Sequence, residues 1–142
     1  MKTNKILLGG LAGAVTLFLL GWLVYGVLLR DYMTSNTNYN QCAAKPMEDM
    51  IMWAMILSNL AIGFLISLVF SWSNTTGVMA GAKVAGIIGL LLTIAVDFSV
   101  YAMSTTFSNL TTVFIDIIIY TVMFAIGGVV VAWVMGMVKK EA

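Results

Sequence analysis

Four long apolar segments constrain this chain more than any other feature of its sequence. Residues 6–29 and 50–72 contain no charged residue, while residues 84–103 and 112–138 contain one each, Asp97 and Asp116. Each segment reaches the ~20 residues that a helix needs to cross ~30 Å of hydrocarbon. The two-residue alternation of a membrane β-barrel is absent, so helices must satisfy the backbone in lipid. The sequence therefore predicts an all-α fold, an integral membrane four-helix bundle.

Composition supports a lipid environment and excludes several functional classes. Apolar residues make up 61% of the 142 residues and charged residues 9%, against roughly 25% charged residues in a soluble domain. The length fits one transmembrane domain, residues 1–142, with the lipid bilayer as its main partner. The net charge of +1, with no basic run, argues against a nucleic-acid partner.

The sequence also lacks the usual residues of enzymatic chemistry. It contains no histidine and one cysteine, Cys42, so it lacks the commonest general base and cannot form an internal disulfide. We therefore expect no enzymatic activity and no catalytic residues. Methionines and Cys42 near the first loop are soft donors that suit Cu(I), but methionine is an ordinary apolar filler. We accordingly assign no metal site and no cofactor.

The distribution of basic residues predicts the orientation. With four spans, both termini and the second loop lie on one side of the membrane, which then holds Lys2, Lys5, Lys83, Lys139 and Lys140. The opposite side holds only Arg30 and Lys45. Because basic residues favour the cytoplasmic side, we expect a multi-pass protein of the inner or plasma membrane with both termini in the cytoplasm.

The first loop, residues 31–49, is the only sizeable segment expected outside the membrane. Residues 34–41 are polar and uncharged, which predicts a mobile loop. Residues 45–49 read as the start of a helix, because Pro46 suits a first turn and Glu48 and Asp49 complement the positive end of the helix dipole.

Polar and small residues recur on one face of each later segment. In the third segment Gly86, Gly89, Thr93, Asp97 and Tyr101 follow helical spacing, and Asn59 begins a similar stripe in the second. Such residues collect where membrane helices touch. The pattern predicts a bundle with a partly polar interior.

Asp97 and Asp116 are the strongest candidates for chemistry. They lie at similar depth on consecutive antiparallel segments, ~6–10 Å below the boundary at ~1.5 Å per residue, and each has a tyrosine one turn further on, Tyr101 and Tyr120. An intramembrane acid costs roughly 2.5–3.5 kcal/mol on insertion scales and is a functional hypothesis by default. The alternative is that each acid is protonated, or bonded to a hydroxyl, and holds helices together. Arg30 is the nearest cation, and it either pairs with an acid or extends to the interface.

The end of the first segment carries a resemblance. Residues 21–29, GWLVYGVLL, are similar to the end of the first helix in a bacterial family of small four-span membrane proteins catalogued as a domain of unknown function. Val24 stands where that family typically has a tryptophan. The fourth segment, with Gly127, Gly128 and Trp133, is also similar. The resemblance implies a four-helix fold and no particular activity.

Two functional hypotheses follow. We favour a helix-packing structural or accessory membrane protein, which associates with copies of itself or with another membrane protein. The alternative is a small proton- or cation-coupled transporter that uses Asp97 and Asp116. A carrier should contain a cavity that reaches the two acids from one side, whereas an accessory protein should have them sealed by packing.

Overall fold

The computed structural model describes residues 2–38 and 49–138. Within these ranges the chain forms α1 (Lys2–Leu23), a π-helical segment η1 (Val24–Leu28), α2 (Arg30–Asn36), α4 (Met52–Trp72), α5 (Val78–Met103) and α6 (Leu110–Met137), and no strand. Four helical spans are long and apolar enough to cross a membrane: α1 with η1, α4, α5 and α6. The predicted all-α fold with four membrane-length helices is confirmed.

The helix ends differ from the predicted boundaries at several places. α5 begins at Val78, before the predicted start at residue 84. The prediction began the helix after Lys83, but Lys83 is exposed within the helix, and the apolar stem of a lysine is compatible with a position at the membrane edge. α1 likewise includes residues before position 6, and α4 begins at Met52. α6 begins at Leu110, where the side chain of Asn109 accepts a hydrogen bond from the Thr112 N–H at 2.9 Å.

The expected mobile loop is partly helical, which corrects the sequence interpretation. Thr34, Ser35 and Asn36 belong to α2. The end of α2 is tied to the α5–α6 loop, since the Asn38 N–H donates to the Thr106 carbonyl at 2.7 Å and the Ser108 N–H donates to the Asn36 carbonyl at 3.0 Å. Cys42 and nearly all of the helix start predicted at 45–49 lie outside the described residues.

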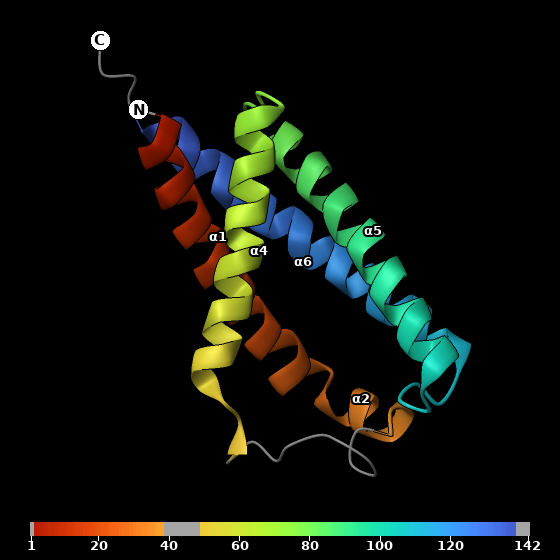
Figure 1. The fold of residues 1–142 in the computed structure, drawn as a ribbon. Coiled ribbons are helices and arrows are strands. Elements are labelled where there is room, and N and C mark those ends of the chain that lie inside the picture. The colour runs from red at the N-terminus through yellow and green to blue at the C-terminus, as the bar shows by residue number, and fades with distance from the viewer. Residues whose placement is uncertain (1, 39–48, 139–142) are drawn as a thin grey trace.

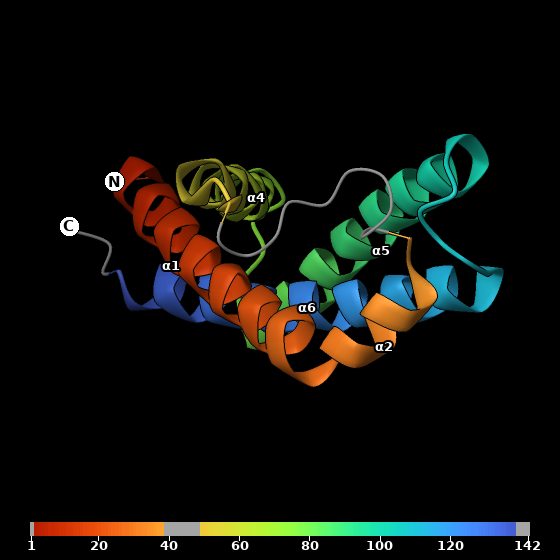
Figure 2. The same ribbon diagram turned by 90° about the horizontal axis from the view of Figure 1, so that it is seen from below.

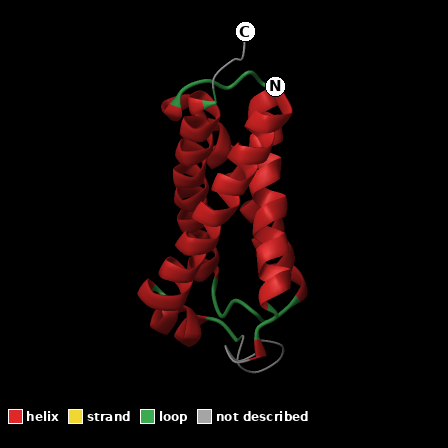
Figure 3. Ribbon diagram, turned by 90° about the vertical axis from the view of Figure 1, so that its left-hand side faces the viewer, coloured by secondary structure: helices red, strands yellow, loops and turns green. Residues whose placement is uncertain are grey.

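The helices form two closely packed pairs, and the contact of α6 with α1 connects one pair to the other. α1 packs against α4, α5 packs against α6, and α1 also contacts α6. Figure 3 shows the four long helices alongside one another, and Figure 2 shows α4 beside α1. Glycines allow the close approach: a Cβ on Gly63 of α4 would lie 2.6 Å from the Ala14 nitrogen, and one on Gly128 would lie 2.5 Å from the Gly81 carbonyl oxygen.

α4 and α5 meet at one end of the bundle and diverge toward the other. They are joined by a short turn between Trp72 and Val78, barely contact each other along their length, and their far ends lie apart in two views (Figures 1 and 2). The divergent half of α4, from Met52 to Ile62, has no buried residue, whereas Gly63, Ile66, Ser67 and Phe70 are buried in the other half. α4 is therefore tightly packed from Gly63 to Phe70 and loosely packed in the half that precedes Gly63.

Candidate intramembrane acid site

The structure brings Asp97 and Asp116 together between α5 and α6. Their exposed fractions are 6% and 5%, and their carboxyl groups lie next to each other. The predicted meeting of the two helix faces is therefore observed.

Tyr25 positions Asp116 from a third helix. Its hydroxyl donates a hydrogen bond of 2.6 Å to Asp116 Oδ1. Tyr25 lies in η1, where the wider turn is marked by the Leu29 N–H donating to the Val24 carbonyl at 2.7 Å. A single π-helical turn in an α-helix changes the direction of the side chains near it and is frequent at functional sites.

Asp97 retains an unused acceptor. Its Oδ2 atom is buried and has no hydrogen-bond partner in the part of the chain that the structure describes. Most buried polar atoms in folded proteins are paired, because an unpaired one pays the full cost of leaving water. The Asp97 Oδ2 atom is therefore an exception that needs a physical explanation.

A cavity of about 420 Å³ adjoins the acid pair. It draws residues from η1, α2, α4, α5, α6 and the α5–α6 loop, and the two acids are the only charged residues in the described part of its lining. The lining residues are Tyr25, Met33, Ile62, Leu92, Thr93, Val96, Asp97, Val100, Phe107, Asp116, Tyr120 and Phe124. The acids are thus almost fully buried but lie in the wall of a ligand-sized space.

The other residues singled out in the sequence fall into two groups. Tyr120 lines this cavity, and its ring lies 5.5 Å from that of Tyr25. Thr93 also lines it, with its hydroxyl bonded to the Gly89 carbonyl at 2.8 Å. Asn59 lines an adjoining cavity of about 270 Å³ that shares Tyr25 and Tyr120 with the first.

Tyr101 and Arg30 lie away from the acids. Tyr101 is 41% exposed on α5 and does not line the cavity. Arg30 is exposed at the start of α2 and makes no ion pair within residues 2–38 and 49–138. The hydroxyl group that bonds an acid comes instead from Tyr25.

Sequence reasoning did not select Tyr25, Phe124 or Met33 for the site. The one available signal was the position of Tyr25 on the same loose stripe as Gly21 in the first segment. The π-helical turn that directs its hydroxyl toward α6 has no recognised sequence pattern, and Phe124 is indistinguishable from any other apolar residue of α6.

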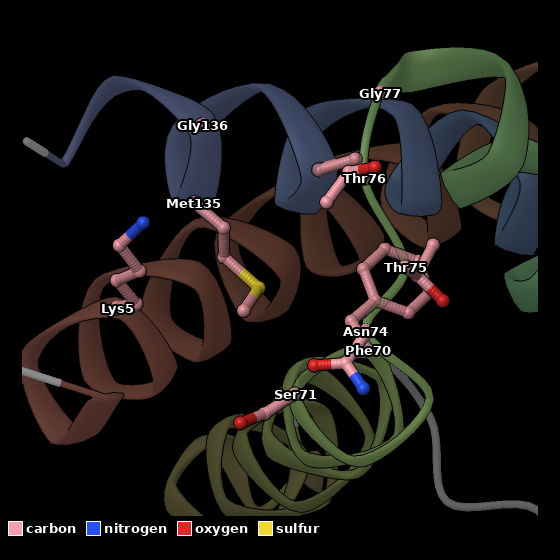
Figure 4. A pocket seen from close by; sticks show the side chains of 10 residues that line it. Lys5, Phe70, Ser71, Asn74, Thr75, Thr76, Gly77, Met135 and Gly136 are labelled. Carbon is pink, nitrogen blue, oxygen red and sulfur yellow. The ribbon is translucent and has the colours of Figure 1, made fainter. Parts of the chain in front are cut away.

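A third cavity, of about 550 Å³, lies at the opposite end of the bundle (Figure 4). Lys5 from α1, Asn74 and Thr75 from the α4–α5 turn and Met135 from α6 surround it. Among the described residues that line it, Lys5 is the only charged one.

No group of three or more His, Cys, Asp or Glu side chains forms among the described residues, and structural zinc sites use four such ligands. Comparisons with protein-family models, with curated proteins and with solved structures found no match. The argument for function therefore depends on the site itself.

Proposed function

We propose that this protein is a small membrane carrier that exchanges a monovalent cation for a proton at the Asp97–Asp116 pair. The observation that supports this proposal most is that Asp97 lines the 420 Å³ cavity and has a buried Oδ2 atom with no hydrogen-bond partner among the described residues. Acids that serve only to hold helices together should be satisfied and enclosed by packing. Asp97 instead has one unsatisfied oxygen and lies beside a cavity.

Charge conservation favours a monovalent ligand. In this proposal the two neighbouring carboxyl groups share one proton, because two carboxylates side by side in a low-dielectric interior repel each other. The pair then carries a net charge of −1, since two carboxylates contribute −2 and the proton +1. If a monovalent cation replaces that proton, the net charge of the site is again −1. The exchange thus leaves the charge buried in the low-dielectric interior unchanged, which avoids the cost of burying an additional charge.

Tyr25 gives the two acids different roles. Its hydrogen bond occupies one oxygen of Asp116 and holds that carboxyl group in place. Asp97, which has a free oxygen, is then the group that first contacts an incoming cation, and the shared proton leaves from the pair. Intramembrane carboxyl groups are the usual relays for protons in membrane carriers.

Proton flux in proteoliposomes tests the proposal. The purified protein is reconstituted with a trapped pH-sensitive dye, and Na⁺, K⁺, tetramethylammonium and tetraphenylphosphonium are added in turn outside, with protein-free vesicles as the baseline. We expect at least one of these cations to drive proton release from the vesicles. Asp97→Asn and Asp116→Asn should each abolish that release, because asparagine keeps the shape of a protonated acid but cannot give up a proton.

Asp31→Asn is the matched control. Asp31 is an exposed acid in the first turn of α2 and does not line the cavity, so its replacement should leave the flux unchanged. Size-exclusion profiles establish that all three variants are folded. If no cation drives proton release, or if the Asp97 and Asp116 variants behave like Asp31→Asn, the carrier proposal is wrong.

A structural or accessory role is the second candidate, and a different observation favours it. The half of α4 from Met52 to Ile62 contains no buried residue, so a second copy or another membrane protein could pack there. Cross-linking in membranes through a cysteine introduced at Leu57, which is 58% exposed, tests this role in a Cys42→Ser background. A monomeric protein without a cross-linked partner would exclude it.

A further inference from the structure

The lining of the acid cavity suggests which cations it accepts, given the proposed function. Apart from Asp97 and Asp116, its members are uncharged, and most are aliphatic or aromatic. A small hydrated ion needs several oxygen ligands to replace its water shell. Few are available here, since the Thr93 hydroxyl is bonded to Gly89 and the Tyr25 hydroxyl to Asp116.

Three aromatic rings form one wall of the cavity. Tyr25 and Tyr120 have ring centroids 5.5 Å apart, and Tyr120 and Phe124 have centroids 6.4 Å apart. Aromatic faces attract organic cations through their quadrupole and also provide apolar contact area. The combination of a negative pair and an aromatic wall therefore matches a cation with an apolar body.

The cavity is covered on the side that carries α2. Met33 of α2 and Phe107 of the α5–α6 loop belong to its lining, and Phe107 is 7% exposed. The two segments are held together by backbone hydrogen bonds, including the one from the Ser108 N–H to the Asn36 carbonyl. A ligand that comes straight from water at this end would have to separate them.

α4 and α5 diverge toward the end of the bundle that carries α2 (Figure 1), and both helices contribute residues to the lining of the cavity. Leu92 and Val96 of α5 line the cavity and are 41% and 57% exposed. Asp97 lies about two turns from the end of α5 at Met103, or ~10 Å at ~1.5 Å per residue. Amphipathic cations reside at that depth, with the charge near the headgroups and the apolar body in the hydrocarbon.

We propose that the acid site takes lipophilic organic monocations, and that they enter sideways from the membrane between α4 and α5. The volume of about 420 Å³ is in the range of small-molecule pockets. The ligand places its positive centre against Asp97 and its apolar body against Tyr120 and Phe124, and the shared proton of the acid pair is released to water.

The ligand class is tested by the same vesicles with a graded series of cations. Tetraphenylphosphonium and ethidium are lipophilic monocations, whereas tetramethylammonium and K⁺ carry the same charge without an extended apolar body. We expect proton release with the first two at concentrations at least tenfold lower than with the last two. If K⁺ or tetramethylammonium is equally effective, the carrier proposal stands and the ligand class is wrong. If none of them acts, the carrier proposal itself fails.

The entry route is tested by narrowing the opening. Val96→Trp places a bulky side chain at an exposed position in the lining of the cavity. Leu91→Trp is the matched control, since Leu91 is 61% exposed on the same helix but does not line the cavity. We expect Val96→Trp to slow ethidium-driven proton release at least fivefold and Leu91→Trp to leave it unchanged. Equal rates in the two variants, at equal folded yield, would overturn lateral entry.

Discussion

The hydrogen bond between Tyr25 and Asp116 gives the most direct prediction from the site. Tyr25→Phe removes the hydroxyl that donates to Asp116 Oδ1 at 2.6 Å and leaves an acceptor on a side chain that is 5% exposed. The ring contact with Tyr120 at 5.5 Å can persist, because the aromatic ring is retained. The loss is therefore that of one hydrogen bond rather than that of packing.

The magnitude follows from the environment of the bond. A hydrogen bond to a charged group contributes ~1.5–3 kcal/mol in water-soluble proteins. Hydrogen bonds between membrane helices average ~0.6 kcal/mol and reach ~1.7 kcal/mol, because the unfolded chain in a membrane also finds partners. A short bond to a buried carboxyl group belongs near the upper end of the second range. We expect Tyr25→Phe to lower the free energy of unfolding by ~1–2 kcal/mol.

Reversible unfolding in mixed micelles, monitored by tryptophan fluorescence, measures this difference. Tyr101→Phe is the matched control: Tyr101 is 41% exposed and has no hydrogen bond within the described residues. Its replacement should change the free energy of unfolding by less than ~0.5 kcal/mol, as expected for an exposed site. Infrared spectra of Tyr25→Phe should also show a shifted carboxyl band. The same band should be absent from the spectrum of Asp116→Asn, which identifies it as that of Asp116. Equal stabilities of Tyr25→Phe and Tyr101→Phe, with no band shift, would refute the reasoning.

Three further predictions concern packing and topology. Gly63→Ala should destabilise the protein by up to ~3 kcal/mol, because the new Cβ would meet backbone atoms of Gly10 and Ala14. Gly136→Ala should be neutral, since a Cβ at this position would meet no neighbouring atom within 4 Å. Equal unfolding free energies of the two variants would contradict the α1–α4 contact. A membrane-impermeant maleimide should label Cys42 in intact cells, and labelling only after permeabilisation would place this loop inside or show that the thiol is shielded. A reporter fused to the C-terminus should be active in the cytoplasm, and external activity would invert the orientation drawn from the lysine distribution.

Much of the fold was predictable because the bilayer allows few solutions. A run of apolar residues that long has to be a helix, so the existence of four spans follows from length alone. The meeting of Asp97 and Asp116 was also predictable, since both lie near a short connection between antiparallel helices and on faces marked by small residues. The ends of the helices were less accurate, as at Val78, because a lysine near the membrane edge does not end a helix.

The parts that escaped prediction depend on packing between distant segments. Tyr25 is separated from Asp116 by most of the chain, and its direction is set by the π-helical turn at Val24–Leu28. The cavity results from the divergence of α4 and α5, which no local pattern records. The covering of the acids by α2 likewise depends on hydrogen bonds between Asn36 or Asn38 and the α5–α6 loop.

The uneven packing of α4 links the fold to the proposed exchange. At Gly63 the backbone of α4 is in direct contact with α1, so this point of the helix is fixed. Beyond it, from Ile62 to Met52, no side chain is buried, and few apolar contacts oppose movement of that half. A carrier must expose its site alternately and therefore needs one element whose two positions differ little in free energy. The loose half of α4, which borders the cavity through Ile62, is the element of this bundle that best meets that requirement, with Gly63 as its fixed point.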